Sequence, residues 1–347
     1  MNKKIIAAAV VLLVAAGAWL GAEEKLPKPA TKEAAKLMEK AQKAVTAKDL
    51  DGALALYAEV QKLEPAYAPA FLTAALVYRM KQDDENALSY LEKAVQANPE
   101  FLRGVDAYAQ LLAEKGRQMS AQGKPAASLP YFSRLVAIPG LDMTHKTAYI
   151  DGLFNMGISA FQARQFDVSV EAFTKLMAVP DVAVAAKPSF LLTHYMLGFN
   201  LSLLDKPEEA NGYLRKYVEL VAAEPGNNFA PVADYMIAKN EYTLLDKEVA
   251  KLRSDKEVTD VMAKVKTKAA EYANIPELLG KAIAGKPELE DAYLVLGNYQ
   301  YLAGDLDQAI ASYKTLLEKF AGSANKAEYE SFLKKLEEEK AAPEAKK

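Results

Sequence analysis

The chain has 347 residues, of which 51% are hydrophobic and 26% are charged, and this balance is typical of a folded protein rather than a disordered one. Its formal net charge of −3 gives no electrostatic reason to expect nucleic-acid binding, which would need a strongly basic face. The chain has no cysteine and only two histidines, which excludes disulfides, thiolate metal sites, cysteine nucleophiles and a multi-histidine metal cage within one chain.

Positions 1–22 have the pattern of a bacterial secretory signal. Two lysines precede an uncharged apolar run at positions 5–21, and small residues stand just before Glu23, which is the order of the charged, apolar and cleavage regions of such signals. The length of this run is at the short end of what spans a bilayer, so an uncleaved membrane anchor is the alternative. We expect an exported, periplasmic protein or, in the alternative, an inner-membrane-anchored protein that faces the periplasm.

A polar linker with two prolines, residues 23–31, leads into a repeated pattern that residues 65–99 show most clearly. Two apolar helical runs flank a polar break there, and a proline ends the unit because its ring cannot continue a helix. Pro65 and Pro99 hold the same place in successive units, and so do Ala53 and Ala87. A helix-turn-helix unit that recurs about every 34 residues predicts a stacked α-solenoid, in which each unit buries its apolar face against its neighbours.

Small residues recur within the units at one constant spacing. In each unit one small residue belongs to the first helix and the other to the second, which predicts a close approach of the two helices. The pairs are Ala41 and Ala53, Ala75 and Ala87, Gly198 and Ala210, and Gly297 and Ala309.

The pattern predicts five repeats over residues 32–222, of which the third departs from the common length. The interval from Pro99 to its closing proline, Pro139, is longer than the interval from Pro65 to Pro99, so we expect a first helix that is longer by nearly two turns. Residues 223–287 match poorly, and we expect a degenerate helical region with runs at about 232–252 and 256–272 and a short extra helix after them.

The last repeat, residues 288–322, is again strong. Residues 323–347 follow it, with one amphipathic helix at about 326–339 and a charged tail. A solenoid needs a polar-faced terminal element to keep its last repeat soluble, so this helix is predicted to cap the array.

These units resemble the tetratricopeptide repeat over about residues 32–222 and 288–320. The resemblance implies an all-α, right-handed α-solenoid whose concave groove is lined by the first helix of each repeat and binds peptides or protein segments. Transferred by position, the groove residues are Leu72, Leu76, Arg79, Met80, Phe154, Ile158, Phe161, Tyr195, Phe199, Leu294, Asn298 and Tyr301. The alternative for each of them is a place in the core between helices, where aromatic residues at helical spacing usually lie.

No motif for chemistry emerges from the sequence. There is no glycine-rich phosphate loop, nucleophile elbow or metalloprotease helix, so we expect neither an enzyme nor a cofactor or metal. His194 lies on a helix that reads as buried and is expected to be a hydrogen-bonded interior residue, whereas His145 is expected to be a solvated loop residue. Some family members grip a terminal carboxylate, but only Asn298 matches that pattern, without its basic companions.

The function expected from the sequence is therefore a non-enzymatic interaction scaffold of the bacterial cell envelope. Its partners would be protein or peptide segments, with no nucleic acid, and a membrane only through an uncleaved N-terminal segment. The alternative is a structural subunit of an inner-membrane-anchored machine for outer-membrane, pilus or cell-wall assembly.

Overall fold

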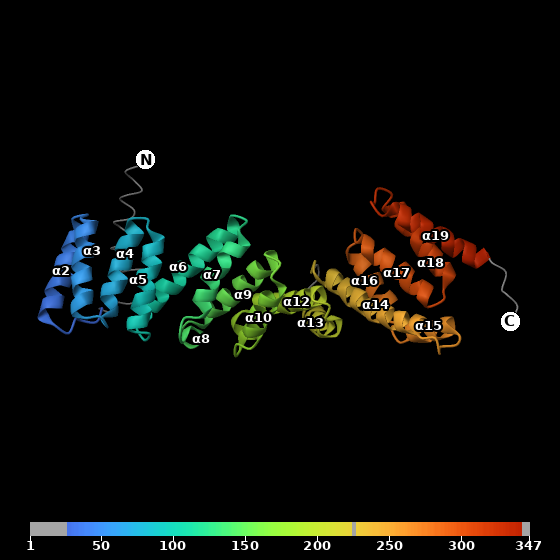
Figure 1. Cartoon of the computed structure of the whole chain (residues 1–347), viewed down its shortest axis with the longest axis horizontal. Coiled ribbons are helices and arrows are strands. Elements are labelled where there is room, and N and C mark those ends of the chain that lie inside the picture. Colours follow the sequence, from blue (N-terminus) through green and yellow to red (C-terminus); the bar gives the residue numbers. More distant parts are fainter. Residues whose placement is uncertain (1–25, 224–226, 342–347) are drawn as a thin grey trace. The chain divides into compact units, whose positions relative to one another are not determined.

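The computed structural model describes residues 26–223 and 227–341, and the secretory signal predicted for residues 1–22 lies outside them. All regular secondary structure in these residues is helical (Figure 1). None of the described helices has both the length and the apolar character that crossing a membrane requires.

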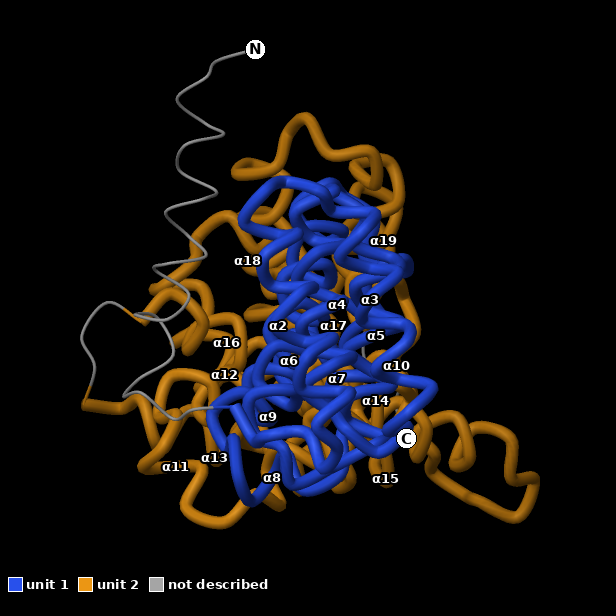
Figure 2. The backbone as a smooth tube through the Cα atoms, turned by 90° about the vertical axis from the view of Figure 1, so that its left-hand side faces the viewer, with its two compact units in different colours: residues 1–159 blue, residues 160–347 orange. Residues whose placement is uncertain are grey.

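The chain divides into two compact units, residues 1–159 and 160–347 (Figure 2). The first unit contains α2 (Lys32–Thr46), α3 (Leu50–Leu63), α4 (Ala68–Met80), α5 (Asp84–Ala97), α6 (Leu102–Ala121), α7 (Pro125–Val136), α8 (Leu141–Thr144) and most of α9 (Lys146–Gln162). The second contains α10 (Phe166–Met177), α11 (Val182–Ala185), α12 (Lys187–Leu203), α13 (Pro207–Val221), α14 (Ala230–Ser254), α15 (Val261–Ala270), α16 (Ile275–Gly285), α17 (Glu290–Leu302), α18 (Leu306–Lys319) and α19 (Lys326–Ala341).

Within each unit the helices form consecutive hairpins. The two helices of a hairpin pack closely, as in α2 with α3, α4 with α5, α6 with α7, α12 with α13 and α17 with α18. Each hairpin then packs against the next one along the chain through α3 and α4, α5 and α6, or α13 and α14. This arrangement is the α-solenoid that the sequence predicts.

The turns inside the hairpins share one backbone geometry. One residue in each turn has a positive φ, between 55° and 81°, and the amide after it donates to the carbonyl five residues earlier, which is the Schellman arrangement that ends a helix. The left-handed residues are Lys48, Gln82, Gly123, Arg164, Asp205 and Gly304, and their closing bonds are 2.8–3.0 Å long. This geometry reverses the chain in the same way in every one of these hairpins.

The predicted close approach of the two helices is confirmed at the small residues. Ala41, Ala53, Ala75 and Ala87 are each fully buried. At Gly198 an added Cβ would lie 2.4 Å from Cγ of Leu214. Only a small side chain fits at these crossings, because the backbones there leave no room for more.

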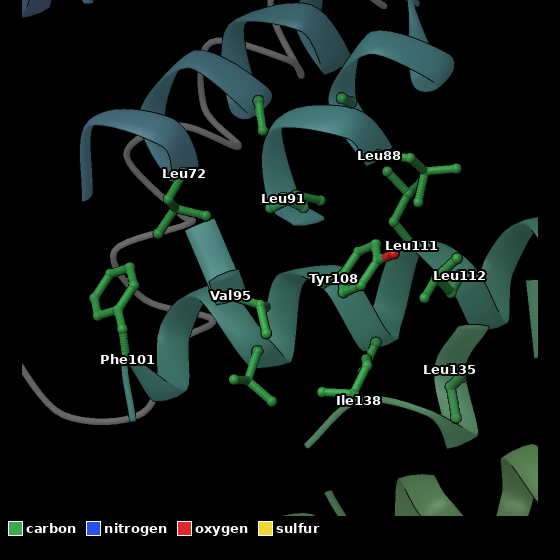
Figure 3. Close-up of a cluster of buried hydrophobic side chains, with 14 of the residues drawn as sticks. Leu72, Leu88, Leu91, Val95, Phe101, Tyr108, Leu111, Leu112, Leu135 and Ile138 are labelled. Carbon is green, nitrogen blue, oxygen red and sulfur yellow. The ribbon is translucent and has the colours of Figure 1, made fainter. Parts of the chain in front are cut away.

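In the first unit one hydrophobic cluster spans two successive hairpins. Buried side chains from α4, α5, α6 and α7 interlock in one cluster that includes Leu72, Leu91, Tyr108 and Leu135 (Figure 3). Helix α6 has 20 residues where α4, the first helix of the preceding hairpin, has 13, which confirms the predicted lengthening.

Residues 230–285 also form a helical hairpin, but its first helix is longer and an extra helix separates the two paired helices in the sequence. The 25-residue α14 pairs with α16, and α15 is inserted between them in the sequence. Side chains at Ala233–Ala238 of α14 are all buried, because α13, α16 and α17 surround this helix. The weak repeat pattern of this region reflects that insertion and the all-round burial of α14.

The last helix, α19, packs on α18. Its Tyr329 and Leu336 are buried against Tyr313 and Leu316 of the final hairpin, while most of its other side chains stay exposed. This is the polar-faced end that the sequence predicts.

The described part of the predicted linker is held against the first unit. Leu26 packs on the hydrophobic cluster there, and the Tyr67 hydroxyl donates to the Pro27 carbonyl at 2.6 Å. The amides of Ala30 and Thr31 donate to the Glu64 carboxylate at 3.0 and 2.7 Å. Thr31 also caps α2, its hydroxyl accepting from the Ala34 amide at 3.1 Å.

Candidate binding surface

The first helices of neighbouring hairpins lie on one face of the first unit. Helices α4 and α6 contact each other directly, and α6 and α9 form the two walls of a hollow of about 430 Å³. This volume falls within the range of about 300–1,000 Å³ typical of ligand pockets. We call it the α6–α9 hollow.

The α6–α9 hollow exists because the helix positions that face it carry small side chains. Ala109 and Ala113 of α6, Ala148 of α9 and Phe132 of α7 line it. The Phe132 side chain is only 1% exposed. Larger residues at the alanine positions would close the space, so the hollow follows directly from this choice of residues.

The lining of the hollow includes a contact between His145 and Asp106 that the sequence reading did not foresee. Nε2 of His145 lies 2.5 Å from Oδ1 of Asp106. The Thr144 hydroxyl donates to the Gly140 carbonyl at 2.8 Å, and the same oxygen lies 2.8 Å from Nδ1 of His145. The prediction of a solvated His145 was wrong, because the side chain is 21% exposed and bonded on both nitrogens.

The remaining polar lining carries one charge of each sign. Gln110 and Arg117 extend the α6 wall, and Asp151 and Asn155 extend the α9 wall. The Asn155 amide donates to the main-chain carbonyl of Asp151 at 2.7 Å. The pKa of Asp151 is raised, because partial burial removes water from the carboxylate and this outweighs the nearby Arg117 charge, which favours ionisation.

The predicted groove residues of the first unit lie in different environments. Leu72 is 5% exposed and belongs to the core, so we leave it out of the proposed surface, whereas Leu76 is 37% exposed. Arg79 pairs with Asp84 at 3.4 Å and with Glu114 at 3.2 Å, which joins α4 to α6. Met80, Phe154 and Ile158 are half-buried.

The predicted aromatic residues of the second unit form one continuous row. The Phe161 ring meets the Phe199 ring edge-on at 5.5 Å, and the Phe199 ring packs at a tilt against the Tyr195 ring at 6.0 Å. Tyr195 in turn lies 5.1 Å from Phe229, which is 47% exposed. Tyr195 itself is 7% exposed, and burial raises its pKa to about 12. Phe229 is therefore the exposed end of the row, Phe161 and Phe199 are half-buried members of it, and Tyr195 supports it from inside.

The three predicted residues of the last repeat serve its internal packing. Oδ1 of Asn298 accepts from the Tyr313 hydroxyl at 2.5 Å. The Tyr301 ring meets Phe332 of α19 edge-on at 5.6 Å, and its hydroxyl donates to Glu339 at 3.3 Å. Half-buried Leu294 packs in the same cluster. Contacts within the last hairpin and with the capping helix therefore occupy these predicted groove side chains.

His194 has the environment that its sequence context predicts. It is 5% exposed and its Nδ1 lies 3.1 Å from the Phe190 carbonyl. Burial lowers its pKa, so the ring is neutral near pH 7 and belongs to the interior.

The residues around the α6–α9 hollow were missed by the sequence reading. That reading took groove positions from four repeats and none from residues 100–121, where the repeat departs from the common length. The available signal was the helical spacing of Asp106, Gln110 and Arg117, with alanines between them on the same face. Asp151 and Asn155, one turn apart, repeat this signal on α9.

Comparison with known proteins supports the repeat interpretation at two places. Residues 69–100 and 291–323 match the tetratricopeptide repeat family model. These segments correspond to the α4–α5 and α17–α18 hairpins, whose turns have the same left-handed geometry. No curated protein matches the chain.

Several solved structures are similar at low sequence identity. PilW, described as a widely conserved type IV pilus biogenesis factor, is 20% identical over 68% of this chain and 99% of its own, with a TM-score of 0.31. PilF of Pseudomonas aeruginosa is 16% identical over 76% of this chain and 96% of its own, with a TM-score of 0.41. YrrB, described as a TPR protein with an unusual peptide-binding site, is 21% identical over 57% of this chain and 89% of its own, with a TM-score of 0.30. Similarity at this level carries no information on the partner or pathway of this chain.

Proposed function

We propose that this protein is a non-enzymatic interaction scaffold that binds protein or peptide segments on the first-helix face of its hairpins. The observation that carries the proposal is the α6–α9 hollow, a concave site with alanine walls and polar groups converging from two neighbouring first helices. A few polar groups in an otherwise preformed hollow are what orients a bound ligand. In the second unit, Phe161 and Phe199 provide apolar contact area of the kind that anchors partners.

We further propose that the scaffold works in the bacterial cell envelope after export. The support is the order of charged, apolar and small residues in positions 1–22, which matches a secretory signal. Intact-mass measurement of the protein purified from its native cells tests this. A chain starting at Glu23 supports a released periplasmic scaffold, whereas retention of the first residues supports the anchored alternative.

Selection of a random-peptide display library on the purified protein tests the binding function. We expect a pool of peptides whose binding is lost in the variant Ala148→Leu, because leucine at this position fills the hollow between α6 and α9. Binding is measured by fluorescence anisotropy of the selected peptides against each variant.

A matched control separates filling of the hollow from a general effect of leucine. Ala55 is exposed on α3, a second helix of the same unit, so Ala55→Leu leaves peptide binding unchanged. If no peptide is enriched, or if both variants bind as the parent does, the α6–α9 hollow is not the binding surface.

A further inference from the structure

The two carboxylates that line the α6–α9 hollow differ in whether they have a direct hydrogen-bonding or ion-pair partner. The carboxylate of Asp106 has a direct partner, because its Oδ1 lies 2.5 Å from Nε2 of His145. Among the described residues, no hydrogen bond or ion pair reaches the carboxylate of Asp151 at contact distance, and Arg117 acts on it only through its longer-range charge. One carboxylate in the hollow is therefore without a direct cationic partner.

The partly dehydrated carboxylate of Asp151 favours a positively charged ligand group. Neighbouring protein displaces part of the water around it, and this raises its pKa, so ionised Asp151 gains from a cation that replaces the lost hydration. Asp151 and Arg117 are both exposed residues, but the raised pKa of Asp151 marks a carboxylate that has lost part of its hydration. A ligand cation thus relieves a cost that an anion at the same place would increase.

The shape of the hollow fits a long side chain with a charged end. The apolar residues that line it include Ala109, Ala113, Ala148 and Phe132. Lysine and arginine place an apolar stem along such a surface and keep the charged group at its end. The position of Asp151 among these small residues supplies the carboxylate for that end.

We propose that the α6–α9 hollow receives a lysine or arginine side chain of the bound segment, whose charged group pairs with Asp151. This proposal rests on the proposed function and specifies the chemistry of its partner. Arg117, on the α6 wall, disfavours a second basic residue next to the first and favours an acidic one there.

The test uses the peptides selected on the purified protein, each synthesised with its lysines replaced by norleucine and its arginines by citrulline. We expect one basic residue in each peptide whose replacement weakens binding about tenfold or more, the effect of a hydrogen bond to a charged group. Asp151→Asn lowers the affinity of the parent peptide by a similar factor and leaves the affinity of the norleucine or citrulline peptide almost unchanged.

Charge reversal provides a second, independent variant. In Asp151→Lys, a peptide with glutamate in place of the critical basic residue binds more tightly than the parent peptide. Glu59→Gln removes an exposed carboxylate from α3 and leaves both affinities unchanged. Circular dichroism of each variant shows that helicity is retained, as expected for changes at exposed positions.

The outcomes distinguish this proposal from the one it rests on. An empty selection contradicts the interaction function and this proposal together. A pool that binds the first-helix face, loses binding in Ala148→Leu and responds neither to Asp151→Asn nor to removal of its basic residues contradicts the basic-residue proposal alone.

Discussion

Gly198 in α12 shows how little space the hairpin crossings leave for a single residue. A Cβ at this position would lie 2.4 Å from Cγ of Leu214 and 3.0 Å from the Ala210 carbonyl oxygen. Overpacking of this kind lowers the free energy of unfolding by about 1–3 kcal/mol. The higher helix propensity of alanine offsets up to about 1 kcal/mol of this loss. We expect Gly198→Ala to lower the free energy of unfolding by about 1–2 kcal/mol in urea denaturation.

Gly212 offers a matched control on the facing helix. It lies inside α13, and an added Cβ would meet nothing within 4 Å. Gly212→Ala therefore raises the free energy of unfolding by about 0.5–1 kcal/mol through helix propensity alone. Equal signs for the two substitutions would contradict close packing at Gly198.

Residues of this type could be predicted from the sequence, whereas the hollow could not. A pair such as Gly198 and Ala210 lies within one hairpin, so the spacing of the two residues along the chain is enough to predict their contact. The contact between Asp106 and His145 joins α6 to the junction of α8 and α9, and its geometry depends on how these elements stack and on the lengthened α6. Aromatic residues such as Tyr195 were identified, but helical spacing alone does not say which side of a crossing they occupy.

At the scale of the element, each of the repeated hairpins turns through one left-handed residue. Non-glycine residues pay about 1–2 kcal/mol for this conformation. Gln82 has a φ of 62° and an exposed side chain, so Gln82→Gly relieves this cost. After the larger chain entropy of glycine is subtracted, we expect a gain of about 0.5–1 kcal/mol in the free energy of unfolding.

The reverse substitution is available in a neighbouring hairpin. Gly123 has a φ of 72° and open space around it, so Gly123→Ala changes the backbone preference without a clash. We expect it to lower the free energy of unfolding by about 1 kcal/mol, measured by thermal or urea unfolding. A loss of stability in Gln82→Gly, or no change in Gly123→Ala, would argue against the shared turn geometry.

The sequence pattern predicted the helices themselves but not the geometry of their turns or every pairing between them. Helix positions and the lengthened α6 followed from apolar periodicity and proline spacing, because these are local properties. The turns did not reveal their common geometry, since only Gly123 and Gly304 among the six left-handed residues are glycines. The pairing of α14 with α16 across the inserted α15 is a tertiary choice that no local pattern specifies.

At the scale of the molecule, each hairpin presents its first helix on one face of its unit, and two kinds of surface result. The first unit offers the polar α6–α9 hollow, and the second offers the aromatic row that includes Phe161 and Phe199. Repeat arrays are stabilised mainly by contacts between neighbours, so these first-helix positions are free to vary with the partner. A scaffold that binds an extended segment is the function this organisation supports best.

The most direct test of this account is site-specific photocrosslinking of the full-length protein in its native cells. A benzoylphenylalanine at Gln110, in the α6 wall of the hollow, is compared with one at Glu59 on α3. The account predicts a discrete crosslinked protein from position 110 that disappears when Ala148→Leu is added, and none from position 59. Crosslinking of the same protein from position 59 but not from position 110 would contradict binding on the first-helix face.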